Sequence, residues 1–163
     1  TESLRSSSLK SSVILGPAVW NDPVAARGYG GLLEGAIVAT PFFLGGEQPQ
    51  TSGFVARYRQ AYGQEPELLG AQAYDAAMII IAGLLNTPSG TADFRDKFIS
   101  NLKSVDNMEG VTGKLSVRRD GEISRRMSVL RLHNGELLEV MKGGNVTGFI
   151  PDESKTEDNE KKT

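Results

Sequence analysis

The stretch AQAYDAAMIIIAGLL, residues 71–85, decides the fold of this chain. It predicts a helix with Tyr74 and Asp75 in its polar opening turn and apolar side chains at almost every later position. A helix that is apolar on every face must be buried on every face, so we expect it to be the most buried element of an α/β body. Four aromatic residues of neighbouring helices should pack around it: Phe54, Tyr58, Phe94 and Phe98. Only the opening turn can then meet solvent or a ligand.

Tyr74 is therefore the first candidate for a functional residue. At the polar end of a buried helix, its ring and hydroxyl group can face a ligand. The position also suits a core aromatic residue whose hydroxyl group is held by a neighbour. This structural interpretation is favoured when Tyr74 is taken alone.

The composition excludes several classes of protein. The 163 residues carry a formal net charge of −2, which gives no general attraction to nucleic acid or to an anionic membrane. The chain has no cysteine, which excludes disulfides, thiolate nucleophiles and cysteine metal sites. We find no apolar run as long as a membrane span and no signal-peptide pattern. We expect a soluble chain with a flexible polar tail over residues 143–163.

The first 40 residues have the pattern of a parallel sheet. Residues 12–15 form an apolar run, residues 35–40 form a β-rich run, and proline follows soon after each. Between them, Asp22 followed by Pro23 predicts the start of a short helix. Strand, helix and strand in this order predict a βαβ unit.

Two more helices should flank the apolar one. The first is expected to begin at a cap formed by Thr51 or Ser52 and to end at Gly63. Its aromatic residues recur at every fourth position and predict one stripe: Phe54, Tyr58 and Tyr62. The second is expected to begin at the cap Thr91.

After Asp106 the pattern changes to an antiparallel β meander. Strands are predicted over residues 114–117, from a turn at Asp120-Gly121 to His133, and over residues 136–141. The Asp-Gly pair and the Asn-Gly pair at 134–135 supply the positive φ angles that tight hairpin turns need.

No group of residues supports catalysis or metal binding. His133 is the only histidine and lies beside a hairpin turn, so we expect a structural role at the surface. The glycines at 28, 30 and 31 lack the preceding strand and the final glycine of a dinucleotide-binding motif. The arginines at 118, 119, 125 and 126 fit the solvated face of a sheet better than an anion site. We expect no enzyme activity, no cofactor and no metal.

The remaining candidate is a cleft after the first predicted strand. Ligands of open α/β sheets bind outside the carboxyl ends of the strands, where we expect residues 16–22. Trp20 in this segment is equally well explained as a platform for a ligand or as a lid over the adjoining core.

Four segments, taken in order, resemble the later half of type I periplasmic solute-binding proteins of the leucine/isoleucine/valine-binding class. They are GPAVWNDP (16–23), LEGAIVATPFF (33–43), FVARYRQAYGQEP with AQAYDAA (54–66 and 71–77), and EGVTGKLSVRRDGEI (109–123). The resemblance implies part of the type I periplasmic-binding-protein fold, an α/β fold of three-layer lobes with parallel sheets. In this chain the lobes would be followed by the C-terminal antiparallel meander.

The resemblance also implies a division of the chain. Residues 1–40 would end the second lobe, 41–50 would cross the hinge, 51–106 would be the helical part of the first lobe, and 107–142 would return through the hinge. The chain then looks like the C-terminal portion of a longer protein. Strand edges and apolar faces left open in it would promote self-association.

By the same resemblance, Pro17, Ala18, Val19 and Trp20 line the cleft from the second lobe, and Tyr74 lines it from the first. Amino-acid binders of this family place an acidic residue at the position of Ala18 to hold the ammonium group of the ligand. A methyl group cannot make this charge-assisted hydrogen bond, so simple α-amino acids should bind weakly.

The resemblance implies a noncatalytic, periplasmic or otherwise extracytoplasmic module that passes a small polar or amphipathic molecule to the permease of an ABC transporter. The alternative is a regulatory or scaffold lipoprotein of the same fold that contacts a cell-wall synthase, such as an activator of penicillin-binding proteins. Ala18 and Trp20 in the cleft loop slightly favour this alternative.

Overall fold

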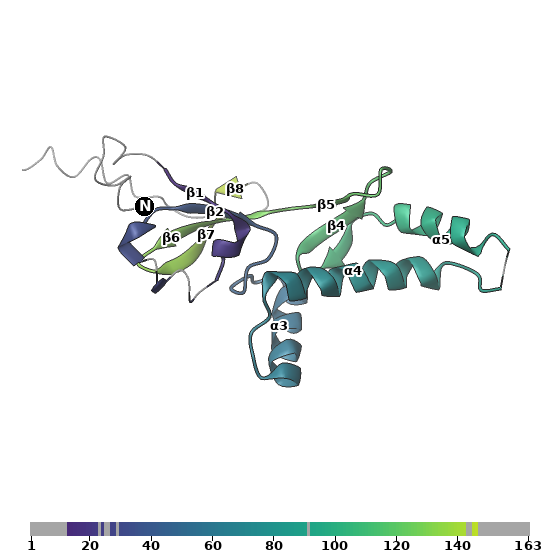
Figure 1. Cartoon of the computed structure of the whole chain (residues 1–163), viewed down its shortest axis with the longest axis horizontal. Coiled ribbons are helices and arrows are strands. Elements are labelled where there is room, and N and C mark those ends of the chain that lie inside the picture. The colour runs from purple at the N-terminus through teal and green to yellow at the C-terminus, as the bar shows by residue number, and fades with distance from the viewer. Residues whose placement is uncertain are drawn as a thin grey trace, which may run out of the picture.

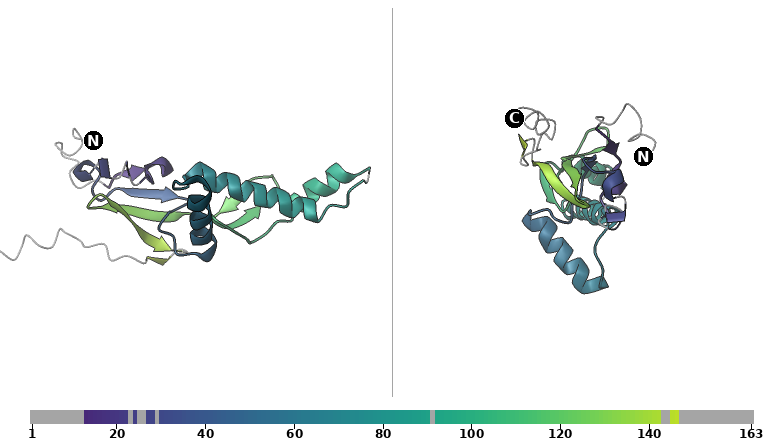
Figure 2. Two further views of the ribbon diagram at one scale, coloured as in Figure 1. Left: turned by 90° about the horizontal axis from the view of Figure 1, so that it is seen from below. Right: turned by 90° about the vertical axis from the view of Figure 1, so that its left-hand side faces the viewer.

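The computed structural model describes residues 13–22, 24, 27–28, 30–90, 92–142 and 145–146. The molecule is elongated, with a five-stranded sheet at one end and the long helices with a three-stranded sheet at the other (Figure 1). Figure 2 shows the long apolar helix extending away from the five-stranded sheet. The molecule therefore has two parts, which we call the sheet part and the helical part.

The sheet part has the strand order β1-β2-β6-β7-β8. Its strands are β1 (Leu15–Gly16), β2 (Ile37–Thr40), β6 (Ser128–His133), β7 (Glu136–Lys142) and β8 (Asn145–Val146). β1 and β2 are parallel, which confirms the predicted pair, and the 3₁₀ helices η1 (Ala18–Trp20) and η2 (Gly30–Leu32) lie between them in the chain. The other pairs are antiparallel. β8 falls within the tail predicted over residues 143–163, and the rest of that tail lies outside the described residues.

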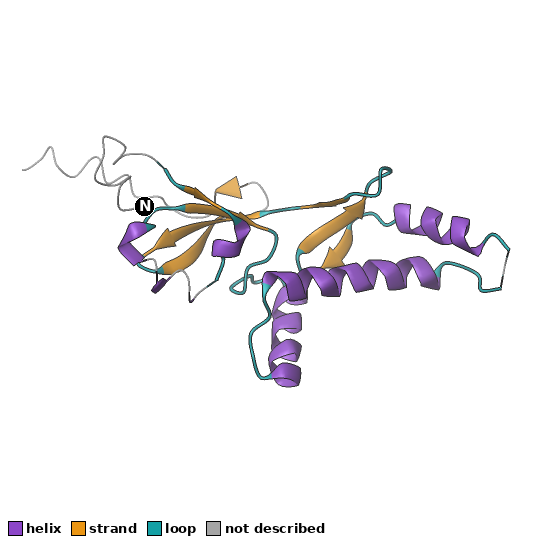
Figure 3. Ribbon diagram, in the orientation of Figure 1, coloured by secondary structure: helices purple, strands orange, loops and turns teal. Residues whose placement is uncertain are grey.

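The predicted meander is wrong in one respect, because its strands belong to two sheets (Figure 3). The strand expected to run to His133 is divided into β5 (Ile123–Arg125) and β6. β5 pairs with β4 (Gly113–Val117), and β4 pairs with β3 (Met108–Gly110), a strand that the sequence did not indicate. The division occurs because β6 has its partner, β2, in the sheet part. Both hairpin turns are confirmed by positive φ angles, which are 92° at Gly121, 52° at Asn134 and 77° at Gly135.

Helix α3 (Pro49–Tyr62) begins before the caps predicted for it, Thr51 and Ser52. Its N-cap is Gln48, whose side chain makes no capping hydrogen bond, and proline occupies the first helical position. Thr51 is buried in the first turn, where its hydroxyl group donates to the carbonyl oxygen of Val111 at 2.9 Å. The threonine therefore joins the helix to the turn between β3 and β4 instead of capping it.

The aromatic stripe of α3 is confirmed, and so is the end of the helix at Gly63, which has a φ of 69°. The ring centroids of Phe54 and Tyr58 are 5.6 Å apart, and those of Tyr58 and Tyr62 are 4.6 Å apart. Phe54 also lies 4.9 Å from Tyr74 on the next helix. Phe54, Tyr58 and Tyr74 belong to one core cluster, whose buried residues are Phe42, Phe54, Val55, Ala71 and Val111. Tyr62 lies outside it and is exposed.

Helix α4 (Leu68–Leu85) is not the most buried element, contrary to the prediction. Its buried residues recur at every fourth position and form a single stripe: Ala71, Asp75, Ile79 and Gly83. Ile80 is 47% exposed and Leu85 is 81% exposed. Apolarity on every face predicted burial on every face, but the described residues cover only one face of this helix.

Three of the four aromatic residues predicted to surround α4 contact it. Besides Phe54, the ring of Tyr58 lies against Gly70, and Phe98 lies against Gly83. Phe98 belongs to helix α5 (Phe94–Lys103), and Phe94 stacks on it with the ring centroids 6.2 Å apart. The N-cap of α5 is Asp93, and the predicted cap Thr91 lies outside the described residues.

By length and composition alone, α4 could cross a membrane, although the sequence analysis found no such segment. Core helices of globular proteins pass the same test. Its one charged residue, Asp75, is 1% exposed and accepts hydrogen bonds from the turn between β3 and β4. Asp75 was expected to meet solvent or a ligand with Tyr74, and the structure corrects this expectation.

Candidate functional site

A cleft of about 630 Å³ lies between two segments that are far apart in the sequence. One wall is formed by η1 and the residues after it, and the other by the α3–α4 loop and the first turn of α4. Most of the lining is apolar, and it includes Ala18, Val19, Val24, Phe42, Leu44 and Leu68. A concave, largely apolar site of this size with a few polar groups is typical of small-molecule binding.

The first wall forms where β1 ends. Pro17 follows the strand, and the chain turns into η1, where the N–H of Trp20 donates to the carbonyl oxygen of Pro17 at 2.9 Å. The side-chain amide of Asn21 donates to the carbonyl oxygen of Phe42, which ties this wall to the end of β2. Ala18 and Val19 line the cleft, whereas Pro17 does not contribute to its lining. A contact between these residues and a ligand stays a prediction.

Trp20 lies against the core of the sheet part. It packs on a cluster whose buried members are Leu33, Ala36 and Leu132, and its ring leaves no room for a side chain at Gly16. Trp20 is not among the residues that line the cleft. Its contacts are those expected of a lid over the core, and a role as a platform for a ligand stays a prediction.

The second wall is the loop that joins α3 to α4. Pro66 in this loop is buried, and Glu65 is held by Arg59, with Nη2 and Oε1 2.6 Å apart. The hydrogen bond from Arg59 to Glu65 raises the pKa of the arginine. Leu68 and Leu69 then bring the first turn of α4 to the cleft.

Tyr74 is not among the residues that line the cleft. Its half-buried ring packs on Phe54, in the cluster that also contains Phe42, Leu44 and Leu68. The last three of these residues line the cleft. Tyr74 therefore belongs to a cluster that shares three residues with the lining of the cleft. Direct contact of Tyr74 with a ligand stays a prediction.

Among the charged groups of the cleft, Asp22 lies in the segment 16–22 expected there, whereas Arg27 and Glu67 were not predicted. Asp22, Arg27 and Glu67 line it, and none of them has an ion pair among the residues that the structure describes. Asp22 was also predicted to cap a helix, and one of its carboxylate oxygens accepts a hydrogen bond from the N–H of Val24 at 2.8 Å. No sequence motif marks these three residues as a group, because the fold alone brings them together.

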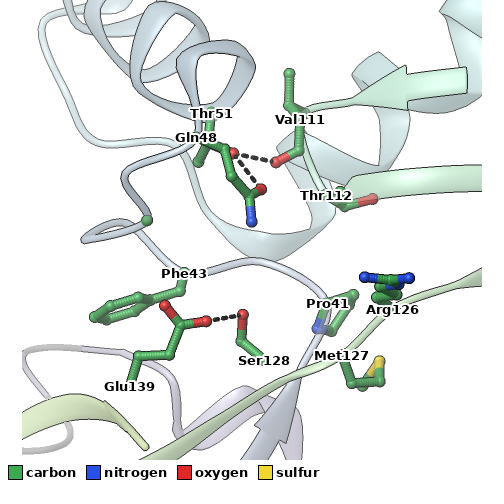
Figure 4. A pocket seen from close by; sticks show the side chains of 12 residues that line it. Pro41, Phe43, Gln48, Thr51, Val111, Thr112, Arg126, Met127, Ser128 and Glu139 are labelled. Atoms are coloured by element: carbon green, nitrogen blue, oxygen red, sulfur yellow. Dashed lines mark hydrogen bonds between the residues drawn. The ribbon is translucent and has the colours of Figure 1, made fainter. Parts of the chain in front are cut away.

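A second cavity, of about 40 Å³, lies where the connections between the two parts of the molecule meet (Figure 4). Pro41 comes from the connection between β2 and α3, and Met127 from the connection between β5 and β6. On its sheet side, the hydroxyl group of Ser128 donates to Glu139 at 2.6 Å. A space of this size suits water rather than an organic solute.

Two other residues considered from the sequence, His133 and Arg118, have structural contacts. The Nδ1 atom of half-buried His133 lies 2.8 Å from Oε1 of Glu34, which joins the β6–β7 hairpin to the loop before β2. Arg118 pairs with Asp120 and Glu122 within its own hairpin. Across the described part of the chain, no group of three or more histidine, aspartate or glutamate side chains could hold a metal ion.

Comparison with known proteins identifies the family. A family profile described as periplasmic binding protein matches residues 3–136. A branched-chain amino acid ABC transporter protein from Rhodospirillum rubrum is 27% identical, with a TM-score of 0.70. The leucine-binding protein LivK from Thermotoga maritima is 24% identical with a TM-score of 0.62. A solute-binding protein from Rhodopseudomonas palustris in complex with 3,4-dihydroxybenzoic acid is 23% identical with a TM-score of 0.63. The last two support the fold alone. No curated protein matches.

The solved structures are longer than this chain. The three matches cover 85%, 78% and 78% of this chain but only 39%, 36% and 35% of the matched chains. This chain therefore spans less than half of their length. Its fold is part of the type I periplasmic-binding-protein fold, as the sequence predicted. The chain belongs to the periplasmic binding protein family.

Proposed function

We propose that this chain forms part of a noncatalytic, extracytoplasmic binding protein that holds a small polar or amphipathic solute for an ABC transporter. The observation that carries the proposal is the cleft between η1 and the α3–α4 loop. Its apolar lining can desolvate the body of a solute, and its charged groups can orient a polar end. The family supports this reading, since its structural relatives are substrate-binding proteins.

The lining indicates the chemistry of the solute. An aliphatic or aromatic body would pack on Phe42, Leu44 and Leu68, while a charged group would meet Arg27 or the carboxylate of Asp22. Ala18 offers no partner to an ammonium group, so a solute with an amine would need a carboxylate elsewhere in the cleft. The relatives bind compounds of both kinds, with leucine in one and benzoate in another.

We also propose the division into lobes that the resemblance implies. Residues 1–40 would belong to the second lobe and residues 51–106 to the first, with the hinge crossed at residues 41–50. Residues 107–142 would contain the return through the hinge, at the connection between β5 and β6. The division is supported by the two connections, after β2 and after β5, that join the sheet part to the helical part. A solute would then be enclosed as the two lobes close on it, and a membrane permease would receive the closed protein.

Apart from Ala18 and Trp20 in the cleft loop, no observation favours the regulatory alternative. The structures reported above are transport or solute-binding proteins, and no peptidoglycan-synthase partner is named for any of them.

The test is a titration of the intact protein with amino acids, small carboxylates, sugars and muropeptides. Trp20, the only tryptophan, lies one residue from Val19 in the wall of the cleft, so its emission should change when a ligand settles there. We expect the response to weaken in Tyr74→Ala, because the ring of Tyr74 supports the lining, and to persist in the control Tyr62→Ala, whose ring is 67% exposed. Tight binding of leucine that Tyr74→Ala leaves unchanged would overturn the assignment of the site.

A further inference from the structure

We propose that the cleft selects organic cations, in the form of an ammonium group on an apolar body. The carboxylates of Asp22 and Glu67, one on each wall, would receive the ammonium group. The inference rests on the proposed function, because it names the class of solute that the same cleft would hold. Its basis is the set of polar groups in the lining that the fold leaves free.

On the η1 wall, two neighbouring polar residues of the lining have free acceptor oxygens. One carboxylate oxygen of Asp22 accepts the N–H of Val24 at 2.8 Å, and the other accepts no hydrogen bond from the described residues. The side-chain NH₂ group of Asn21 is already used, since it donates to the carbonyl oxygen of Phe42 and lies 3.4 Å from the hydroxyl oxygen of Thr40. The Oδ1 atom of Asn21 accepts no hydrogen bond within the described part of the chain. Both oxygens can therefore accept a donor from a ligand.

The opposite wall contributes a second free carboxylate. Glu67 is exposed and occupies the N-cap position of α4, but its side chain makes no capping hydrogen bond. It also has no ion pair among the residues that the structure describes, whereas the neighbouring Glu65 is held by Arg59. The carboxylate of Glu67 is therefore available to a ligand group.

The charges of these free groups favour a cation. Within the described residues, the lining has two carboxylates without an ion pair but only one such guanidinium, that of Arg27. An ammonium group would be attracted by both carboxylates and could donate three hydrogen bonds to free oxygens. An anion at Arg27 would be repelled by both. An α-amino acid is less suitable than an amine, because its carboxylate is attached to the carbon that bears the ammonium group and would lie close to the same two side chains.

The experiment is an isothermal titration of the intact protein with four solutes that share a phenyl ring on a two-carbon chain. They are 2-phenylethylamine, 2-phenylethanol, 3-phenylpropanoate and phenylalanine. We expect the amine to bind about tenfold more tightly than each of the others, as two charge-assisted contacts at partly hydrated sites would give. Added salt should reduce this preference, because Asp22 and Glu67 are exposed. If the carboxylate or the alcohol binds as tightly as the amine, the proposal is overturned.

Two variants test the carboxylates themselves. Asp22→Asn and Glu67→Gln each remove a charge at constant size, and asparagine at position 22 can still accept the N–H of Val24. We expect each variant to weaken binding of 2-phenylethylamine by about threefold to fivefold and to weaken binding of 2-phenylethanol less. The matched control is Glu136→Gln, at an exposed site of β7 outside the lining, which should bind the amine like the unmodified protein. Unchanged binding of the amine in both cleft variants, or an equal loss in the control, would overturn the proposal.

The outcomes distinguish this inference from the proposed function. If a neutral or anionic solute, from these four or from the panel of the preceding section, binds as tightly as the amine or more tightly, the inference fails and the proposed function stands. If no solute of any charge binds to the intact protein, both fail. Tight binding of the amine that depends on Asp22 and Glu67 supports both.

Discussion

Replacing each of two adjacent isoleucines of α4 by alanine tests which face of this helix is covered. Ile79 is 5% exposed and Ile80 is 47% exposed. Truncating a buried isoleucine costs about 2–5 kcal/mol, since it removes buried apolar atoms and leaves a cavity. We therefore expect Ile79→Ala to lower the free energy of unfolding by about 3 kcal/mol.

Ile80→Ala should cost much less. Burial of one methylene group contributes about 0.8 kcal/mol, so three half-exposed carbons account for roughly 1.2 kcal/mol. No closed cavity forms at an exposed site, and the higher helix propensity of alanine returns roughly 0.4 kcal/mol. The expected net cost is about 1 kcal/mol or less.

Urea denaturation at micromolar protein concentration measures the difference in the free energy of unfolding between the two variants. The comparison requires that the slope of this free energy against urea concentration is the same in both. If Ile80→Ala lowers the free energy of unfolding as much as Ile79→Ala does, the reasoning is refuted. Such a result would mean that the face of α4 left open by the described residues is covered in solution.

Two further predictions follow from the same contacts. Gly110→Ala should destabilise the protein by about 1–3 kcal/mol, because the added methyl group would overpack against Asp75. Gly28→Ala should be nearly neutral in thermal unfolding, because there is open space around Gly28. Equal melting temperatures of the two variants would contradict this prediction. The chain should sediment with a mass that rises with concentration, because Ile81 and Leu85 are exposed on an apolar helix. Changing both to glutamate should reduce the association, and a compact monomer at all concentrations would count against a role for this face.

Local patterns predicted much of the fold. The four-residue spacing of Phe54 and Tyr58 predicted the stripe on α3, and the Asn-Gly pair at 134–135 predicted the hairpin turn, because both depend on residues close in the sequence. The division between β5 and β6 was missed, since no glycine or proline marks it and it depends on pairing of β6 with β2, about 90 residues earlier in the chain.

The site was less accessible to sequence reasoning. The charged lining of the cleft comes from Asp22, Arg27 and Glu67, on segments that meet only in the folded chain. The bonds of Asp75 to Val111 and Thr112 span 36 and 37 residues, so the sequence suggested only a polar residue at the front of a helix. Likewise, the composition of α4 showed that its faces are apolar but could not show which of them other elements cover.

The central claim is that a solute binds in the cleft between η1 and the α3–α4 loop, and an isothermal titration of two matched variants tests it most directly. Ala18→Phe fills the cleft from its wall, while Ala39→Phe adds the same ring at an exposed position of β2. The ligand is a solute found in the titration above. We predict that Ala18→Phe lowers the affinity for this solute at least about tenfold, which corresponds to about 1.4 kcal/mol. The variant Ala39→Phe should bind the solute as tightly as the unmodified protein does. Equal affinities of the two variants would contradict the account.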